Sequence, residues 1–139
     1  MPKMIFVNLP VADLAASERF YEAIGCVKNP QFSNEVAACM VWSETIYFMI
    51  LTHGFFSTFT PRKIADAEAA TEVLVCLSFD SRADVDAVTE AAAQAGGEAD
   101  VRPPQDMGFM YSRAFADPDG HMFEPMWMDP ATVESGPPA

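Results

Sequence analysis

Apolar segments and amphipathic segments follow one another in the same order twice along this chain. In the first half, a largely apolar segment at residues 4–11 precedes residues 14–24, which carry apolar side chains at helical spacing. In the second half, an apolar segment at 72–79 precedes a helical pattern that begins at Ser81. Further extended segments are predicted at 32–36, 37–42 and 45–51, and again at 99–104, 109–116 and 121–128. The pattern predicts two copies of a βαβββ module, which is an α+β fold.

Residues that favour helix ends flank both helical segments. Asp13 is a suitable N-cap for the first helix, and Gly25 can end that helix in the left-handed conformation. Ser81 precedes the second helix, with Asp84 at the third helical position as in a capping box, and Gly96 follows its last turn. The two helices are therefore predicted to have similar boundaries within their modules.

The chain length suits one domain that covers residues 1–139. We divide it into module 1 at 4–51, a linker at 52–71, module 2 at 72–128 and a mobile tail at 129–139. The linker begins with an aromatic group, Phe55, Phe56 and Phe59. These rings either dock the linker onto the body of the protein or form a lid or subunit contact.

Composition excludes several classes of partner. The formal net charge is −12, from 20 acidic and 8 basic residues, which disfavours binding to nucleic acid and to anionic membranes. No apolar run reaches the roughly 20 residues of a membrane-spanning helix, and we expect a cytoplasmic protein. The cysteines, Cys26, Cys39 and Cys76, lack metal-type spacing and are expected to be reduced and buried.

The most informative stretch is a predicted hairpin near the C-terminus. The sequence Asp117-Pro118-Asp119-Gly120 is typical of a tight turn, and the strand that follows carries Glu124 between Met122 and Met126. Those three side chains share one face of the strand, because alternate residues point the same way. A carboxylate between two apolar neighbours needs solvent or a partner. The candidates for this partner are Arg113 and Asn8.

Two stretches resemble the vicinal oxygen chelate superfamily, which includes glyoxalase I, bleomycin-resistance proteins and extradiol dioxygenases. They are Val11-Ala12-Asp13 with Ser17, Phe20-Tyr21 and Gly25, and the segment from Phe115 to Glu124. The resemblance covers about residues 4–128. It implies paired curved mixed sheets around a cleft, and a homodimer, because such modules commonly pair sheets across subunits in this family.

In metal-dependent members of that family, four strands each place one ligand around a divalent ion. The corresponding positions here hold Phe6, Met49 or Ile50, Leu74, and Glu124. Only the glutamate can bind a hard cation, and one carboxylate is too few for useful affinity. His53 and His121 are not expected to rebuild the site. We therefore expect no cofactor, and a divalent metal is disfavoured.

Strand phase then predicts which side chains line the cleft. Glu124 is the candidate catalytic residue, as a general base whose pKa the apolar walls would raise. For Tyr111 and Arg113 a second possibility stays open, in which both side chains point outward from the cleft. The predicted ligand-binding residues are Phe6, Asn8, Met49, Leu74, Cys76, Tyr111, Arg113, Met122 and Met126.

Three functions fit this composition. The first is a protein resembling glyoxalase and bleomycin-resistance members, with an apolar cleft that binds a small organic molecule without the family's metal. The alternative is an enzyme resembling lactoylglutathione lyase, or another metal-dependent member, with Glu124 as metal ligand or general base. The third is a structural partner whose cleft is filled by its own side chains. Whether the chain is an enzyme stays open at this point.

Overall fold

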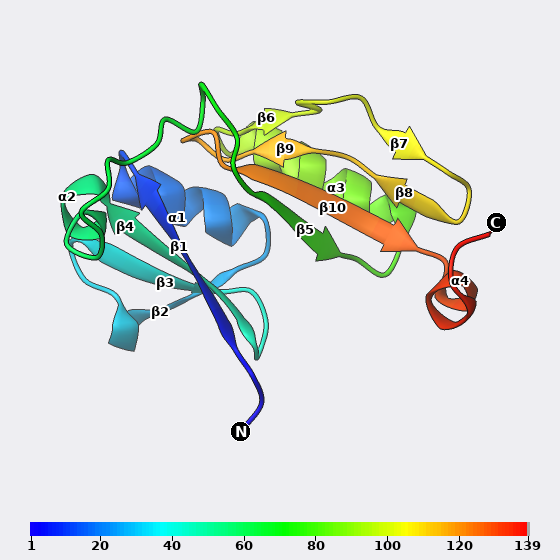
Figure 1. Ribbon diagram of the computed structural model, residues 1–139, viewed down its shortest axis with the longest axis horizontal. Coiled ribbons are helices and arrows are strands. Elements are labelled where there is room, and N and C mark those ends of the chain that lie inside the picture. Colours follow the sequence, from blue (N-terminus) through cyan, green and yellow to red (C-terminus); the bar gives the residue numbers. More distant parts are fainter. Residues whose placement is uncertain (139) are drawn as a thin grey trace.

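The computed structural model describes residues 1–138 and contains two β-sheets, one from each module (Figure 1). The first sheet has the strand order β1-β4-β3-β2, in which β1 pairs parallel with β4. The elements of module 1 are β1 (Ile5–Val11), α1 (Leu14–Ala23), β2 (Val27–Asn29), the 3-10 helix η1 (Pro30–Phe32), β3 (Ala37–Val41) and β4 (Ile46–Thr52). Two βαβββ modules and the α+β class are thus confirmed.

The second sheet repeats this arrangement and adds short strands. Its order is β6-β9-β10-β8-β7, and β5 pairs parallel with β10, as β1 does with β4. The elements of module 2 are β5 (Leu74–Ser78), α3 (Arg82–Gln94), β6 (Glu98–Ala99), β7 (Gln105–Asp106), β8 (Met110–Ser112), β9 (Phe115–Ala116) and β10 (Met122–Met128). In each module the first strand therefore lies beside the last one.

The helix ends were predicted correctly. The Asp13 side chain accepts a hydrogen bond from the Ala16 backbone N–H, and Ser81 does the same for Asp84. Gly25 and Gly96 follow the two helices with φ of 117° and 99°, values that favour glycine. These signals are local, which is why the sequence alone reveals them.

Several predicted segments differ from the structure. Residues 32–36 are not a strand, because η1 and an Asn34 turn lead directly into β3. The segment 99–104 leaves the sheet after Ala99, because the next residue, Asp100, adopts a left-handed conformation with φ of 54°. The segment 109–116 is divided into β8 and β9.

Two short helices lie outside the predicted elements. The linker begins with α2 (His53–Phe56), and the C-terminal region contains α4 (Pro130–Ser135), which Asp129 caps. The predicted mobile tail is thus partly helical, and residue 139 lies outside the described residues. Within residues 1–138, no helix has the length and apolar character needed to cross a membrane.

One hydrophobic core joins the two modules. The ring of Phe123 on β10 lies 5.6 Å from Phe48 on β4 and 6.0 Å from Tyr21 on α1, and Phe20 lies 6.1 Å from Phe115. All five side chains are fully buried. The sides of the sheets that carry α1 and α3 therefore turn toward a shared interior. We call the opposite sides the free faces.

The modules also enclose a cleft between their edge strands. A cavity of about 470 Å³ lies between β1 and β5 beneath the linker, which crosses from α2 to β5 along the top of Figure 1. Of the residues predicted to line the cleft, only Asn8 and Met122 line this cavity. The other predicted lining residues lie elsewhere on the two sheets.

Candidate functional site

The free face of the second sheet carries Glu124 among apolar side chains, as the alternation predicted. Glu124 on β10 lies opposite Cys76 on β5, and Met122 lies opposite Leu74. Met126 is on the same face, and Leu74 remains 55% exposed. Five of the predicted site residues are therefore brought together on one face of module 2.

The partner of Glu124 is Arg102, which the sequence did not single out. The Nη2 and Nε atoms of Arg102 donate to Glu124 Oε2 at 3.0 and 3.3 Å. Nη2 also donates to Ser112 Oγ at 3.0 Å. Both charged side chains are about one-quarter exposed. Neither Arg113 nor Asn8 contacts Glu124 in this way, so the predicted pairing is wrong.

Glu124 keeps one oxygen free of protein donors. Within residues 1–138, all of its side-chain hydrogen bonds go to Oε2, and Oε1 receives none. The ion pair fixes the carboxylate in position through Oε2, while Oε1 can accept a hydrogen bond or proton from a bound molecule. The geometry thus supports recognition or proton transfer at a single oxygen atom.

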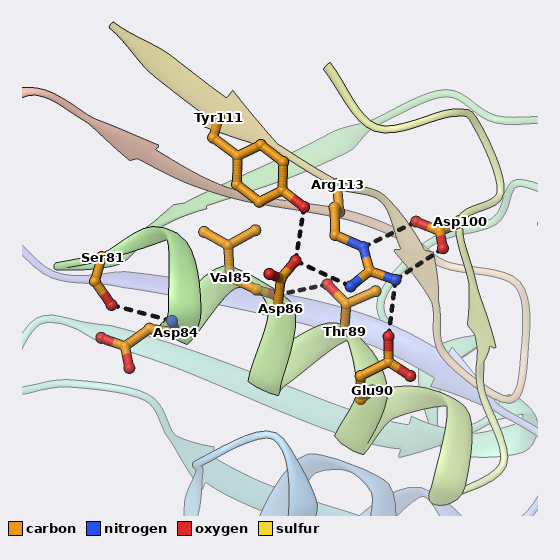
Figure 2. A network of polar contacts seen from close by, with 9 residues as sticks. All are labelled: Ser81, Asp84, Val85, Asp86, Thr89, Glu90, Asp100, Tyr111 and Arg113. Atoms are coloured by element: carbon orange, nitrogen blue, oxygen red, sulfur yellow. Dashed lines mark hydrogen bonds and ion pairs between the residues drawn. The ribbon is translucent and has the colours of Figure 1, made fainter. Parts of the chain in front are cut away.

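Arg113 lies on the opposite, helix-covered side of the same sheet (Figure 2). Its guanidinium donates to Asp100 at 2.8 and 3.0 Å, to Glu90 at 2.9 Å and to Asp86 at 3.1 Å. The Tyr111 hydroxyl donates to Asp86 at 2.6 Å. Tyr111 and Arg113 were predicted to line the cleft, but they face α3 and hold it to the sheet.

The charges of this network shift the pKa values of its members. Hydrogen bonds from the Arg113 guanidinium hold the pKa of Asp100 below its ordinary value. The same bonds, those to Asp100 foremost, raise the pKa of Arg113 itself. The carboxylate of Asp86 raises the pKa of Tyr111. Arg113 is 8% exposed and fully committed to these partners, so it is a structural residue.

The free face of the first sheet is apolar. Phe6 on β1 stacks on Tyr47 with ring centroids 4.5 Å apart, and Met49 lies opposite Asn8. Phe6 is 50% exposed, although it is a large apolar residue near the start of the chain's first strand. Among residues 1–138, the side-chain amide of Asn8 donates only to the Phe6 carbonyl, at 3.2 Å. This face thus offers contact area and a single amide.

The side chains at the four family positions do not fit a divalent metal. Three of the positions cannot supply side-chain oxygen or nitrogen ligands, because they hold Phe6, Leu74, and Met49 or Ile50. The fourth position holds Glu124, whose carboxylate is paired with the Arg102 guanidinium. Within residues 1–138, no group of three or more His, Cys, Asp or Glu side chains is arranged to hold a metal ion.

The Asp-Pro-Asp-Gly turn fastens the modules to each other. The Tyr21 hydroxyl of α1 donates to Asp117 Oδ2 at 2.7 Å, and the Ala12 backbone N–H donates to Asp119 Oδ1 at 2.8 Å. The His121 ring nitrogen Nε2 lies 2.8 Å from the Pro10 carbonyl oxygen. Burial raises the pKa of Asp117. This turn is a clamp between modules, and His121 belongs to it.

The turn is also tightly covered by the linker. Gly120 has a φ of 94°, and a Cβ atom there would lie 2.8 Å from the backbone nitrogen of Glu68. A side chain at this position would collide with the linker backbone. Glycine is therefore required both by the turn and by the close approach of the linker.

The cysteines differ in their surroundings. Cys26 and Cys39 are buried, and burial raises the pKa of Cys26 to about 12, so these thiols behave as small apolar groups. Cys76 is exposed on the free face, contrary to the prediction. Partial burial, with a smaller contribution from Glu124, raises the pKa of Cys76. All three are reduced.

Arg102 and Ser112 were missed for different reasons. Arg102 lies in the proline-rich segment after β6, 22 residues from Glu124, and no local pattern connects them. Ser112 lies opposite Met126 because β8 pairs antiparallel with β10, and this register is not visible in the sequence. The available signal was a carboxylate between two apolar neighbours, which needs a partner, in a chain with few arginines.

A family comparison and a search of curated proteins gave different results. The family model described as the Glyoxalase/Bleomycin resistance protein/Dioxygenase superfamily matches residues 52–124, which is more than half of the chain. No curated protein sequence matches the chain. The match includes the linker, α3 and the start of β10 up to Glu124.

Solved structures share the whole fold. A hypothetical protein, SA1046 from S. aureus, superposes with a TM-score of 0.76 at 25% identity, over 91% of this chain and 95% of that one. A glyoxalase/bleomycin resistance protein/dioxygenase family enzyme from Burkholderia phytofirmans PsJN gives 0.76 at 15% identity, over 91% and 99%. The fosfomycin resistance protein FosX from Mesorhizobium loti gives 0.67 at 18% identity, over 96% and 98%.

Proposed function

Because this chain belongs to the Glyoxalase/Bleomycin resistance protein/Dioxygenase superfamily, we propose that it binds a small organic molecule on its free faces without a metal. The observation that carries the proposal is the Glu124–Arg102 pair. It lies on the free face of module 2 among Leu74, Met122 and Met126, with one carboxylate oxygen unused. Apolar contact area with a few fixed polar groups is typical of sites for organic ligands.

We further propose that a second copy of the chain completes the site. Apolar residues at and near the starts of β1 and β5 are unusually exposed: Ile5 55%, Phe6 50%, Val73 62% and Leu74 55%. A two-fold dimer could place the free face of module 1 over that of module 2 from the partner, at two equivalent sites. The apolar face would then close over the Glu124 face and exclude water.

A second candidate function is catalysis by Glu124 as a general base. The free Oε1 supports it, because a base must be within hydrogen-bond reach of the proton it removes. Arg102 would hold the carboxylate in place through Oε2 during the transfer. The relative FosX is titled a fosfomycin resistance protein, and its 18% identity supports a common fold only.

Methionine resonances can test the binding proposal directly. In protein labelled with methyl-13C methionine, indole and phenol are expected to shift the signals of Met49 and Met126 on the two free faces. Met107, 61% exposed in the turn before β8, is the control signal and should not move. The proposal is wrong if both compounds leave Met49 and Met126 unchanged, or move Met107 as much.

The dimer is tested separately by sedimentation velocity. The protein is expected to sediment as a dimer, and Leu74→Arg as a monomer, because a charge would be buried in the apolar contact. The matched control is Val133→Arg on α4, where the side chain is 67% exposed and lies away from both sheets. A monomeric parent protein, or dissociation by Val133→Arg as well, would refute this arrangement.

A further inference from the structure

The cavity beneath the linker is separate from the Glu124 site and has a different chemical character. Its volume is about 470 Å³, within the range of sites that hold small organic molecules. Strands β1 and β5 form its walls, and residues between Thr60 and Val73, most of them in the linker, form its cover. Its apolar lining includes Val7, Leu9, Phe56, Ile64, Val75 and Met122.

Two adjacent cations also line this cavity. Arg62 and Lys63 are exposed, and within residues 1–138 neither forms an ion pair. This is notable in a chain with only 8 basic residues against 20 acidic ones, where the arginines of module 2 are all paired with carboxylates. Glu72 is the one carboxylate among the lining residues. The cavity lining thus carries net positive charge in a strongly acidic protein.

We propose that this cavity is a second binding site, for an amphipathic organic anion with a single carboxylate. Its apolar body would lie beneath the linker against β1 and β5, and its carboxylate would lie between Arg62 and Lys63. Charge complementarity selects the anion, because the rest of the surface repels it. The apolar lining selects an organic body over a small inorganic ion, since it offers such ions no hydrogen bonds.

The two sites differ in their charged groups, although Met122 borders both of them and Asn8 belongs to both the cavity lining and the free face of module 1. The cavity is lined by neither Glu124 nor Arg102, and it is formed within one chain, whereas the proposed free-face site needs a partner. Binding in the cavity should therefore persist in Leu74→Arg, the variant designed to be monomeric. This separates a failure of the cavity proposal from a failure of the proposed function.

Calorimetry with octanoate tests the proposal. Octanoate is expected to bind one equivalent per chain, and octylammonium, which has the same apolar tail and the opposite charge, is expected not to bind. Arg62→Gln/Lys63→Gln should weaken octanoate binding by roughly 3- to 20-fold, the range for two exposed charge contacts. Binding should also weaken as salt is added.

The matched control removes the same charge elsewhere. Lys3→Gln/Arg19→Gln lowers the net charge equally at two exposed positions that do not line the cavity, and should leave octanoate affinity unchanged. Ala70→Trp places a large ring at the cavity lining and should abolish binding. The proposal is overturned if octylammonium binds as well as octanoate, if the control pair matches Arg62→Gln/Lys63→Gln, or if Ala70→Trp binds normally.

Discussion

The two modules have the same architecture but very different charge content. Within residues 1–138, module 1 contains one ion pair, Lys28–Glu18. Its Nζ–Oε1 distance is 3.1 Å, and both side chains are partly exposed. Module 2 contains three paired arginines, one on the free face, one beneath α3 and one stacked on Tyr111 and Trp127. The same βαβββ scaffold therefore provides apolar contact area in one copy and fixed polar groups in the other.

This difference explains why the candidate chemistry lies on one side of the molecule. The free face of module 1 presents Phe6, Tyr47 and Met49, and that of module 2 presents Glu124 held by Arg102. Neither face has both an apolar cover and a polar centre by itself. Pairing the face of module 1 with that of module 2 would therefore produce a more specific pocket than pairing either face with itself.

The largest expected effect tests whether the modules share one core. Phe123→Ala should lower the free energy of unfolding by about 3–5 kcal/mol, because Phe123 is fully buried between rings of both modules. Unfolding should remain a single calorimetric transition that moves to lower temperature. As a control, Phe32→Ala removes a ring that is 66% exposed and should change stability by less than about 0.5 kcal/mol. Two separate transitions would contradict the shared core.

An intermediate effect is expected from the buried cation of module 2. Arg113→Met should lower the free energy of unfolding by about 2–3 kcal/mol at neutral pH, because charge-assisted bonds to Asp86, Glu90 and Asp100 are lost. The measurement is the urea midpoint of both proteins. Arg19→Met, at an exposed position, should leave this midpoint nearly unchanged.

Acid should reduce the difference between Arg113→Met and the parent protein. Arg113 lowers the folded-state pKa of Asp100 below its ordinary value of 3.8. The folded state thus binds this proton less readily than the unfolded state does. The stabilisation is complete above the ordinary pKa and is lost as pH falls through the lower folded-state value. A difference that stays constant from neutral pH to below the folded-state pKa would show that Asp100 does not titrate in this way.

The smallest effect is expected from the charges of module 1. Lys28→Met should change the free energy of unfolding by less than about 1 kcal/mol, because the Lys28–Glu18 pair is partly exposed. A double-mutant cycle with Glu18→Gln would isolate the contribution of the pair. If its coupling energy equalled that of Arg113 with Asp100, the contrast between the modules would not hold.

Features that depend on neighbouring residues were predictable from the sequence. The caps at Asp13 and Ser81, and the glycines that follow both helices, need only residues within one or two turns. The alternation on β10 correctly placed Met122, Glu124 and Met126 on one face. The repeated order of elements then indicated the two-module fold.

Features that depend on strand register were not predictable. Tyr111 and Arg113 do share a face, as their spacing indicates, but that this face meets α3 is visible only in the fold, where Asp86 accepts hydrogen bonds from both side chains. Arg102 reaches Glu124 from a loop whose path is set by Pro103 and Pro104. Such contacts join distant segments, so the sequence contains the residues but no signal of their proximity.

The pairing of first and last strands in each module also governs how the chain can fold. Ile5 on β1 pairs with Ile46, and Leu74 on β5 pairs with Met122 on β10, so both parallel ladders close long loops. Loops of this length cost entropy before any hydrogen bond is gained, which slows folding. During synthesis, β5 emerges with its edge unpaired and gains its neighbour only when β10 has left the ribosome. A nascent chain that stops before Met122 would leave unpaired the edge of β5 that β10 covers in the finished protein.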